Sequence, residues 1–316
     1  MNRPLYLKDY IGQEHIKKQI SIFISSAKER KDTLDHVLLS GPPGLGKTTL
    51  ANIIANELKA NITVTTGAVL TKKADLAGIL TNLEEGDILF IDEIHRISKP
   101  VEELLYTAME DFAIDIILGK NRAARTIRID LPKFTLIGAT TKAGMLSTPL
   151  LSRFGIILNF DFYDLNSLIK ILKIEANKAG VLIDKKALEE IAKRSRGTPR
   201  IAKRLFKRVY DFAVVNKVNK IDIELVKHAF DLIGIDEYGL SFKDRQYLKI
   251  LVYRFENKPV GIKTISSILH EEEDVIENVI EPYLIRIGFI EKTPRGRIIT
   301  QKGLQYIKER EYERNI

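Results

Sequence analysis

Two short stretches carry residue types that can perform phosphoryl chemistry. The stretch GPPGLGKT, residues 41–48, fits the pattern G-x-x-x-x-G-K-[ST]. Its glycines let backbone N–H groups close around phosphate oxygens, and the helix that follows adds its dipole. We expect Lys47 to reach the β- and γ-phosphates and Thr48 to ligate a metal ion. ATP and Mg²⁺ are therefore the expected cofactors.

The second stretch is ILFIDEIH, residues 88–95. Asp92 lies at the tip of an apolar strand, where its carboxylate can hold the magnesium shell. Glu93 beside it can polarise the attacking water. We interpret His95 as a structural histidine at a strand end, and a metal or base role is the alternative.

Two arginines are candidates for neutralising charge in the transition state, a role often filled by a neighbouring subunit. Arg153 stands in PLLSRFG just before a strand, at a rim that could face such a neighbour. Arg200 stands at the start of a helix, where the helix dipole does not stabilise a positive charge. An anionic ligand would explain that position.

The elements that must position these residues alternate between strand and helix. Buried strands are predicted at 36–40, 61–67, 87–92, 134–141 and 156–162. Helices are predicted at 14–30, after residue 48 and from residue 100. This order predicts an α/β fold, a doubly wound parallel sheet that forms a P-loop ATPase core.

The pattern changes at about residue 164, after which only helices are predicted, at 165–179, 185–195, 199–216 and 222–233. A linker at 234–239 precedes helices at 241–255, 262–270 and 272–287, a hairpin at 289–300 and a last helix. Three helices and a hairpin form a winged-helix order. We therefore predict an ATPase domain (1–163), an all-helical lid (164–234) and a C-terminal winged-helix domain (237–316).

Composition narrows the function classes. The 316 residues include no cysteine, which excludes disulfides and thiol catalysis. No apolar run reaches the ~20 residues of a membrane span, and the N-terminus has no signal-peptide core. We expect a cytoplasmic protein without membrane contact. The net charge of +8 suits an anionic partner, and residues 164–234 carry 16 Lys and Arg against 9 Asp and Glu.

Residues 113–134 alternate apolar and polar side chains around GKNRA, which predicts a protruding β-hairpin. Its isoleucines are Ile114, Ile116, Ile117, Ile127 and Ile129. They would form an exposed apolar patch, or else pack on the core of the domain. The pattern alone leaves both possibilities open.

The stretch EKTPRGRIIT, residues 291–300, is a basic turn with Lys292, Arg295 and Arg297. The helix before it is acidic, with Glu271, Glu272, Glu273, Asp274, Glu277 and Glu281, and duplex DNA would repel that face. We therefore predict that the turn grips DNA phosphates and does not read sequence.

Seven stretches of the chain share one order with a known family. They are HVLLSGPPGLGKTTLA, LFIDEIHR, AMEDF, FTLIGATTKAG, LLSRFGI, RSRGTPRIAKRL and IEKTPRGR. Together they resemble the RuvB family, the Holliday-junction branch-migration motors of the AAA+ class. The resemblance runs from Arg3 to Thr300 and so covers nearly the whole chain.

The resemblance implies a set of nucleotide contacts. Asn2, Arg3, Tyr10 and Ile11 would lie near the adenine and ribose. Gly44, Gly46, Lys47, Thr48 and Thr49 would hold phosphates, and Glu110, Asp111 and Phe112 would line the site. Thr140 or Thr141 would sense the γ-phosphate. Arg153 would be the finger that acts in trans, Tyr163 would sit at the lid hinge, and Arg200 would be the lid sensor.

The family also implies partners. These are further copies of the chain in a hexameric ring, the duplex arms of a Holliday junction, a RuvC-type resolvase, and a RuvA-type protein that binds the hairpin at 114–131. The chain has Lys142 and Lys292 where the family usually has Arg, and Asn2 where it has Leu. Lysine keeps the charge but loses the planar fork of arginine.

Two other functions fit parts of the pattern. An ATP-gated DNA-binding switch similar to replication initiators would also join this core to a winged helix, but its winged helix would be expected to read sequence. A protein-remodelling ATPase would need an aromatic–glycine pore loop, and the chain shows no convincing one after the second predicted strand.

Overall fold

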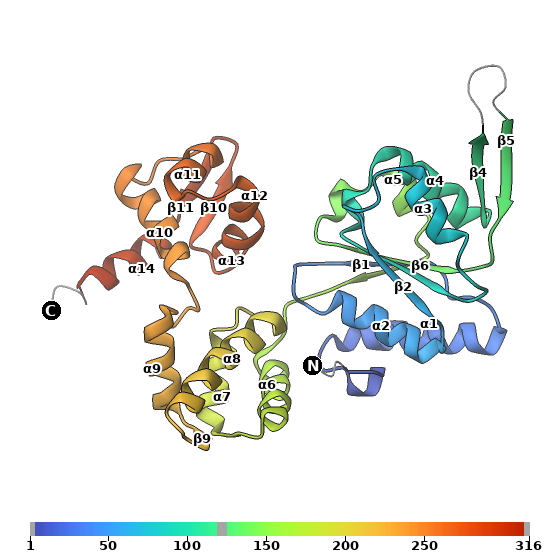
Figure 1. Cartoon of the computed structure of the whole chain (residues 1–316). Coiled ribbons are helices and arrows are strands. Elements are labelled where there is room, and N and C mark those ends of the chain that lie inside the picture. Colours follow the sequence, from blue (N-terminus) through green and yellow to red (C-terminus); the bar gives the residue numbers. More distant parts are fainter. Residues whose placement is uncertain (1–3, 119–124, 313–316) are drawn as a thin grey trace. The chain divides into compact units, whose positions relative to one another are not determined.

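The computed structural model of the chain describes residues 4–118 and 125–312. The chain forms two compact units (Figure 1). The first comprises Met1–Ile171 and Thr198–Arg200, and the second comprises Leu172–Gly197 and Ile201–Ile316. Among the described residues, every helix is too short or too polar to cross a bilayer.

A five-stranded parallel sheet forms the centre of the first unit. Its strands are β1 (Val37–Ser40), β2 (Ile62–Thr66), β3 (Ile88–Asp92), β6 (Thr135–Thr140) and β7 (Ile156–Asn159). Their order across the sheet is β2-β3-β6-β1-β7, and every neighbouring pair is parallel. The predicted doubly wound parallel fold is confirmed. The strand order also brings the ends of β1, β3 and β6 together at one edge.

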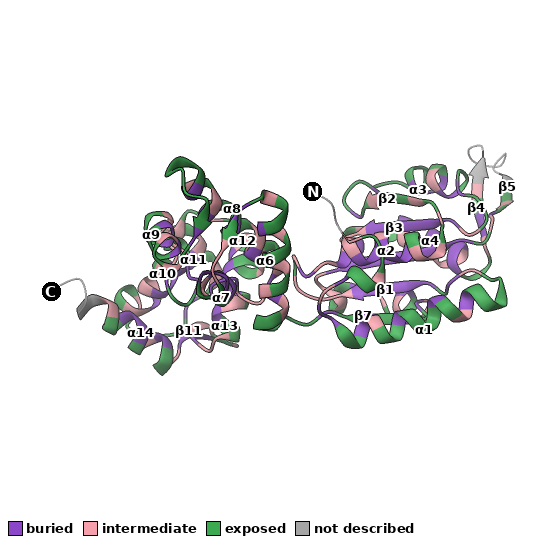
Figure 2. Cartoon of the chain, turned by 90° about the horizontal axis from the view of Figure 1, so that it is seen from below, coloured by how far each residue is buried: buried purple, intermediate pink, exposed green. Residues whose placement is uncertain are grey.

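Helices cover both faces of the sheet (Figure 1). They are α1 (Glu14–Arg30), α2 (Lys47–Leu58), α3 (Lys73–Leu80), α4 (Lys99–Glu110) and α5 (Thr148–Leu151). In α1, Ile16, Ile20 and Ile24 recur at one-turn spacing and are buried. The inner strands β1, β3 and β6 are largely buried, whereas the edge strands β2 and β7 and the outer faces of the helices are partly exposed (Figure 2).

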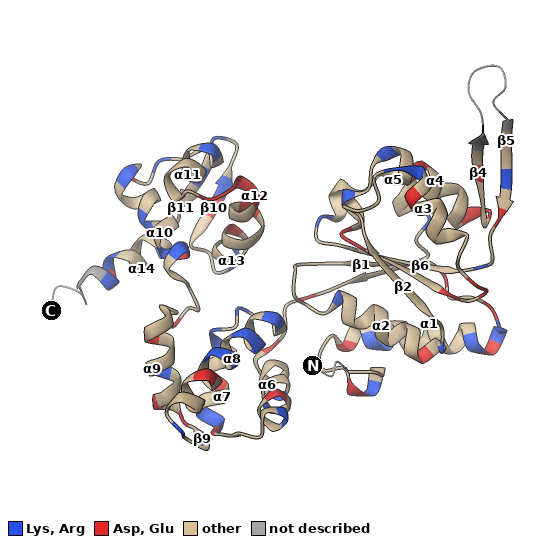
Figure 3. Ribbon diagram, viewed as in Figure 1, with Lys and Arg blue, Asp and Glu red and all other residues tan. Residues whose placement is uncertain are grey.

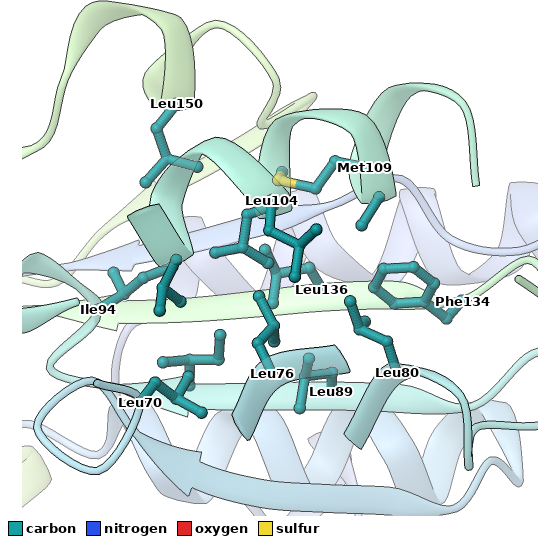
Figure 4. Packing of buried hydrophobic residues seen from close by; sticks show 14 of the residues in the cluster. Leu70, Leu76, Leu80, Leu89, Ile94, Leu104, Met109, Phe134, Leu136 and Leu150 are labelled. Carbon is teal, nitrogen blue, oxygen red and sulfur yellow. The ribbon is translucent and has the colours of Figure 1, made fainter. Parts of the chain in front are cut away.

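The core over one face of the sheet, here called the leucine core, includes leucines from α3 and α4 together with apolar side chains from the strands (Figure 4). Leu76 and Leu80 of α3 pack with Leu89 of β3 and Leu136 of β6, and all four are fully buried. Helix α3 was not among the predicted elements. It has only eight residues and contains Gly78, so its apolar spacing extends over about two turns.

Strand β4 (Ala113–Leu118) is antiparallel to β5 (Arg125–Asp130), as the predicted hairpin requires. Of the two possibilities left open for the isoleucines, packing on the core holds for Ile114, which is fully buried in the leucine core. Ile116 and Ile129 are partly buried against that core. Ile127, in contrast, is 45% exposed. The side chain of Ile117 lies outside the described residues.

The lid contains α6 (Leu165–Ala179), α7 (Lys185–Lys193), α8 (Pro199–Val215) and α9 (Ile223–Ile233). The prediction that this segment is only helical is wrong in one detail. Short strands β8 (Leu182–Ile183) and β9 (Lys220–Ile221) pair in parallel. Strands of two residues are too short to produce an alternating pattern in the sequence.

The C-terminal residues form the predicted winged helix. Its elements are α10 (Phe242–Lys249), α11 (Ile262–Leu269), α12 (Glu273–Val275), α13 (Glu281–Arg286), β10 (Ile290–Thr293), β11 (Gly296–Ile299) and α14 (Gln301–Tyr312). A π-helical turn, Ile276–Ile280, joins α12 to α13. Pro282 accounts for this interruption, because proline cannot donate the backbone hydrogen bond of a regular α-helix. A second π-helical turn, Ile250–Arg254, follows α10.

Arginines of the lid bind the winged helix within the second unit. Arg196 Nη2 lies 2.5 Å from Asp244 Oδ2, and the Asp244 side chain is 4% exposed. Arg196 Nε also donates to the Gly239 carbonyl at 2.8 Å, and its guanidinium lies over the Tyr283 ring. Arg194 donates to the Ile235 carbonyl at 2.9 Å. These contacts join the lid and the winged helix around desolvated charges.

Candidate nucleotide and DNA sites

The phosphate-binding loop connects β1 to α2 as the motif predicts. The Lys47 side chain is buried and folds back on the loop, where Nζ donates to the carbonyls of Gly41 at 2.6 Å and Pro42 at 3.0 Å. Burial lowers the pKa of Lys47, the Glu93 and Asp92 carboxylates oppose that shift, and Arg200 adds to it. A phosphate oxygen could replace these carbonyl acceptors.

Two loop glycines are required by their backbone and surroundings. Gly44 and Gly46 have φ angles of +80° and +103°, which side-chain-bearing residues rarely adopt. A Cβ on Gly44 would lie 2.9 Å from the Cβ of Arg200, and one on Gly46 would lie 2.8 Å from the Tyr10 hydroxyl. The predicted lid sensor and the predicted base-side tyrosine therefore both contact the loop.

Tyr10, predicted for the adenine side, and Tyr163, predicted for the lid hinge, are buried together. The hydroxyls of Tyr10 and Tyr163 lie 3.1 Å apart, and that of Tyr163 donates to the Leu45 carbonyl at 3.2 Å. Burial raises the pKa of both tyrosines, so both hydroxyls stay neutral. Ile11 is half-buried next to this cluster. Asn2 and Arg3 lie outside the described residues.

The acidic pair stands beside the loop. Asp92 ends β3, and its Oδ2 lies 3.5 Å from the Thr48 hydroxyl at the start of α2. Thr49, also in the first turn of α2, is half-buried. Glu93 follows Asp92, and its side chain is 35% exposed. The structure therefore brings together a hydroxyl, a carboxylate and a second, more accessible carboxylate.

The two threonines after β6 lie in different environments. Thr141 donates its hydroxyl to Glu93 Oε2 at 3.1 Å. Thr140 is fully buried, and its Oγ1 accepts from the Lys142 backbone N–H at 3.0 Å and lies 3.0 Å from His95 Nδ1. Only Thr141 of the two is partly accessible and touches the Glu93 carboxylate.

Gly67, which the sequence reasoning missed, supports the backbone of Glu93. Glu93 has a φ of +50°, in the sparsely populated left-handed region. Gly67 follows β2, its N–H donates to the Asp92 carbonyl at 2.8 Å, and a Cβ there would lie 2.4 Å from the Glu93 carbonyl oxygen. In the sequence, the only sign of this contact was that a glycine, Gly67, ends the predicted strand at 61–67.

Arg153 lies against the end of α4. Its Nη2 is 2.5 Å from Glu110 Oε2, its Nη1 donates to the Pro149 carbonyl at 2.7 Å, and its guanidinium lies over the Tyr106 ring. The two residues after Glu110 have other contacts: Asp111 pairs with Arg128 at 2.8 Å, and Phe112 packs on His36 and Phe134. Glu110 is therefore grouped with the predicted finger.

The three basic residues of the wing do not share one environment. Arg297 is 12% exposed, and its Nε donates to Glu281 at 2.8 Å while its Nη2 donates to Glu277 at 2.7 Å. Lys292 lies opposite Arg297 in the β10–β11 ladder, and its Nζ is 2.8 Å from Glu281. Arg295 is exposed at the turn between the strands.

Part of the acidic charge expected to repel DNA is therefore compensated within the domain (Figure 3). The Glu281 carboxylate is fully buried and also accepts from the Tyr247 hydroxyl at 3.0 Å. Burial raises its pKa, but the hydrogen bonds and charges of Arg297 and Lys292 outweigh burial and hold it below the usual value. Arg295 is thus the wing residue best placed to reach a phosphate.

Comparison with known proteins assigns all three parts of the chain. The profile described as the Holliday junction DNA helicase RuvB P-loop domain matches residues 2–160. The profile of the RuvB AAA lid domain matches residues 163–236, and that of the RuvB C-terminal winged helix domain matches residues 237–308.

Individual relatives agree with these matches. The Holliday junction branch migration complex subunit RuvB of Thermotoga maritima is 53% identical over 306 residues, which cover 97% of this chain and 92% of that protein. The protein of the same name from Thermotoga petrophila is 53% identical over the same shares. A structure described as the Thermotoga maritima RuvB Holliday junction branch migration motor has a TM-score of 0.88 and 51% identity, covering 97% of this chain and 98% of that one.

The loop and the acidic pair predict two different defects. Lys47→Ala should abolish nucleotide binding, because Lys47 is the cation placed to neutralise phosphate charge. Glu93→Gln should bind ATP but hydrolyse it at least ~100-fold more slowly, because the carboxylate acts on the water alone. Fluorescent-nucleotide titration and phosphate release measure the two effects. A Glu93→Gln protein that turned over at the normal rate would contradict the assignment of the base.

The wing predicts that neighbouring arginines differ in their effects. Arg297→Met should destabilise the winged helix by ~3 kcal/mol, because it removes a main partner of the buried Glu281. The stabilising effect of Glu281 is present above its ordinary pKa of ~4.3 and is lost as the pH falls through its lowered pKa. Calorimetry at pH 7 and in acid measures both.

Arg295→Ala is the matched variant, and it should leave the melting temperature unchanged while weakening duplex binding. The salt slope of log K should fall by roughly 0.9, similarly for unrelated duplexes. If Arg297→Met were as stable as the parent and alone lost DNA affinity, Arg297 would be the phosphate contact instead.

Proposed function

The chain belongs to the RuvB family of ATP-hydrolysing branch-migration motors, and from this premise we propose how its residues act. ATP is hydrolysed at the edge of the sheet where β1, β3 and β6 end, and the resulting movement drives duplex DNA through a Holliday junction. The observation that carries this proposal is the convergence of Lys47, Glu93 and Thr141 at that edge, in a chain that also contains a winged helix.

Glu93 orients the water that attacks the γ-phosphorus. A bond forms between the water oxygen and phosphorus, the bond to the β-phosphate oxygen breaks, and ADP leaves with the electron pair. The proton of the water passes toward the Glu93 carboxylate or a phosphate oxygen. Thr141 directly follows β6 and donates its hydroxyl to Glu93. It is therefore a better candidate than Thr140 for sensing the γ-phosphate.

The residues beside the loop fit Mg²⁺. Magnesium prefers oxygen ligands at 2.0–2.1 Å and is usually held by one or two protein groups plus phosphates. The Thr48 hydroxyl and the Asp92 carboxylate, 3.5 Å apart, are such oxygens and can share one coordination shell. When bound, the ion would neutralise charge on the β- and γ-phosphates.

Arg153 acts on the nucleotide of a neighbouring subunit, in a ring that we take to be hexameric. Its pairing with Glu110 supports this role, because the ion pair holds the Arg153 guanidinium at the end of α4. Arg200 acts on the nucleotide of its own chain, since its backbone N–H approaches the Gly44 carbonyl at 3.4 Å.

The domain divisions of the proposed motor are 1–163, 164–234 and 237–316. The wing holds duplex arms through Arg295, while Lys292 and Arg297 anchor the wing to the third helix. A RuvA-type protein binds the hairpin near Ile127, and a RuvC-type resolvase completes the assembly. The motor works in the cytoplasm.

Branch migration on a synthetic four-way junction tests the proposed function. The chain should convert the junction into two duplexes when ATP and a RuvA-type protein are present, and the Glu93→Gln protein should not. ATP-dependent DNA binding without strand exchange, and with preference for one sequence, would favour the initiator-like switch.

The role of Arg153 predicts complementation between two inactive chains. Arg153→Ala should lower hydrolysis by ~10³-fold or more. Mixing Arg153→Ala with Lys47→Ala chains should restore part of the activity, because some interfaces then join an intact loop to an intact finger. Phosphate release is measured after native mass spectrometry confirms mixed rings. No recovery in proven mixed rings would place Arg153 in its own chain's site.

The hairpin predicts a separable partner contact. Ile127→Ser should lower partner-dependent branch migration while basal ATPase stays normal, since Ile127 is 45% exposed on β5. Ile22→Ser, which changes an isoleucine 66% exposed on α1, is the matched control and should leave both activities unchanged. Equal effects of the two substitutions would argue against docking at the hairpin.

A further inference from the structure

We propose that His95 is a positioning residue that holds the Glu93 carboxylate in the orientation needed for hydrolysis. The inference rests on the proposed role of Glu93 as the group that orients water. The sequence reasoning favoured a purely structural role for His95, and the contacts of its ring supply the reason to revise that interpretation.

His95 lies in a short 3-10 turn, Ile94–Arg96, directly after the acidic pair. Its side chain is only 7% exposed. Nδ1 lies 3.2 Å from Glu93 Oε2 and 3.0 Å from the Thr140 hydroxyl. The ring therefore bridges the residue after β3 and the last residue of β6.

The direction of the hydrogen bond follows from chemistry. A carboxylate can only accept, so Nδ1 carries the proton, and its one N–H lies between Glu93 Oε2 at 3.2 Å and the Thr140 hydroxyl oxygen at 3.0 Å and is shared by both. Thr141 donates its hydroxyl to the same oxygen, Oε2, at 3.1 Å. Two donors from different elements, the turn after β3 and the end of β6, thus converge on one carboxylate oxygen.

Two fixed donors on Oε2 restrict the side-chain torsions of Glu93. The position of the other carboxylate oxygen, Oε1, is then fixed as well. Glu93 is 35% exposed and would otherwise exchange among rotamers. Precise placement of a catalytic group is worth a large factor in rate, because a shift of ~1 Å can cost ~100-fold. The left-handed backbone of Glu93 sets the direction in which its side chain leaves the chain, and His95 helps to fix the position of the carboxylate.

The contact between the His95 ring and the Thr140 hydroxyl connects Glu93 to the end of β6. The Thr140 hydroxyl is fixed by the Lys142 backbone N–H at 3.0 Å, so His95 is oriented by a fully buried group. A change at residues 140–142 would then be transmitted to Glu93 through His95 as well as through Thr141. His95 needs no contact with the nucleotide for this role.

Substitutions that keep or remove the donor at the Nδ1 position test the proposal. Asparagine places an amide N–H near the position of Nδ1, glutamine places its amide one methylene further out, and leucine removes it. Steady-state ATPase, ATP affinity and melting temperature are measured for His95→Asn, His95→Gln and His95→Leu. His36→Leu is the matched control, because His36 is buried in the same unit but bonds the Met109 carbonyl and the Leu136 N–H instead.

We expect His95→Leu and His95→Gln to lower kcat by ~10- to 100-fold with ATP affinity unchanged, and His95→Asn to regain most of the rate. His36→Leu should lower the melting temperature but leave kcat unaffected. If the Asn protein is as slow as the Gln protein while both are folded, or if all three turn over normally, the proposal is overturned. If His95→Leu does not fold, the Asn and Gln proteins decide.

Glu93→Gln is measured in parallel and separates the role of Glu93 from that of His95. A normal rate in that protein overturns the base itself and, with it, the role of His95. A slow Glu93→Gln protein combined with a normal His95→Gln protein overturns only the positioning role.

Discussion

The order of strands in the parallel sheet is the constraint on which the nucleotide site depends. Because β6 lies between β1 and β3, the glycine-rich loop, Thr140 with Thr141, and the acidic pair all emerge at adjacent strand ends. Parallel strands place their carboxyl ends at one edge of a sheet, where ligands of α/β folds bind. The leucines of α3 and α4 stabilise this order by packing across β3 and β6.

Close backbone approach then converts this proximity into defined geometry. Gly67 lets the strand beside β3 contact the Glu93 carbonyl, and Gly44 and Gly46 let Arg200 and Tyr10 reach the loop. Glu93 itself keeps a left-handed backbone, a conformation that persists only when its surroundings impose it. The side chains of Glu93, Arg200 and Tyr10 are thus positioned by backbone segments that have little conformational freedom.

Local patterns predicted more of the fold than of the contacts. Helix α6 has the bounds predicted from its apolar spacing, and the glycine-rich loop occupies the predicted strand–helix junction. Alternation in the hairpin identified a face but not what packs on it, so the sequence left open whether Ile114 was exposed or part of the core. The pairing of Arg297 with Glu277 and Glu281 joins residues 20 and 16 positions apart, and no short-range pattern encodes it. The ring contacts of His95 depend equally on the tertiary structure.

The buried pair between Arg196 and Asp244 has a mechanical consequence. Separating two charges in a desolvated setting is strongly unfavourable, so the joint between lid and winged helix is stiff. A stiff joint stores little elastic energy under load and loses little of a displacement along its length. A displacement of the lid is therefore passed to the winged helix with little slack, and compliance must be sought in other parts of the chain.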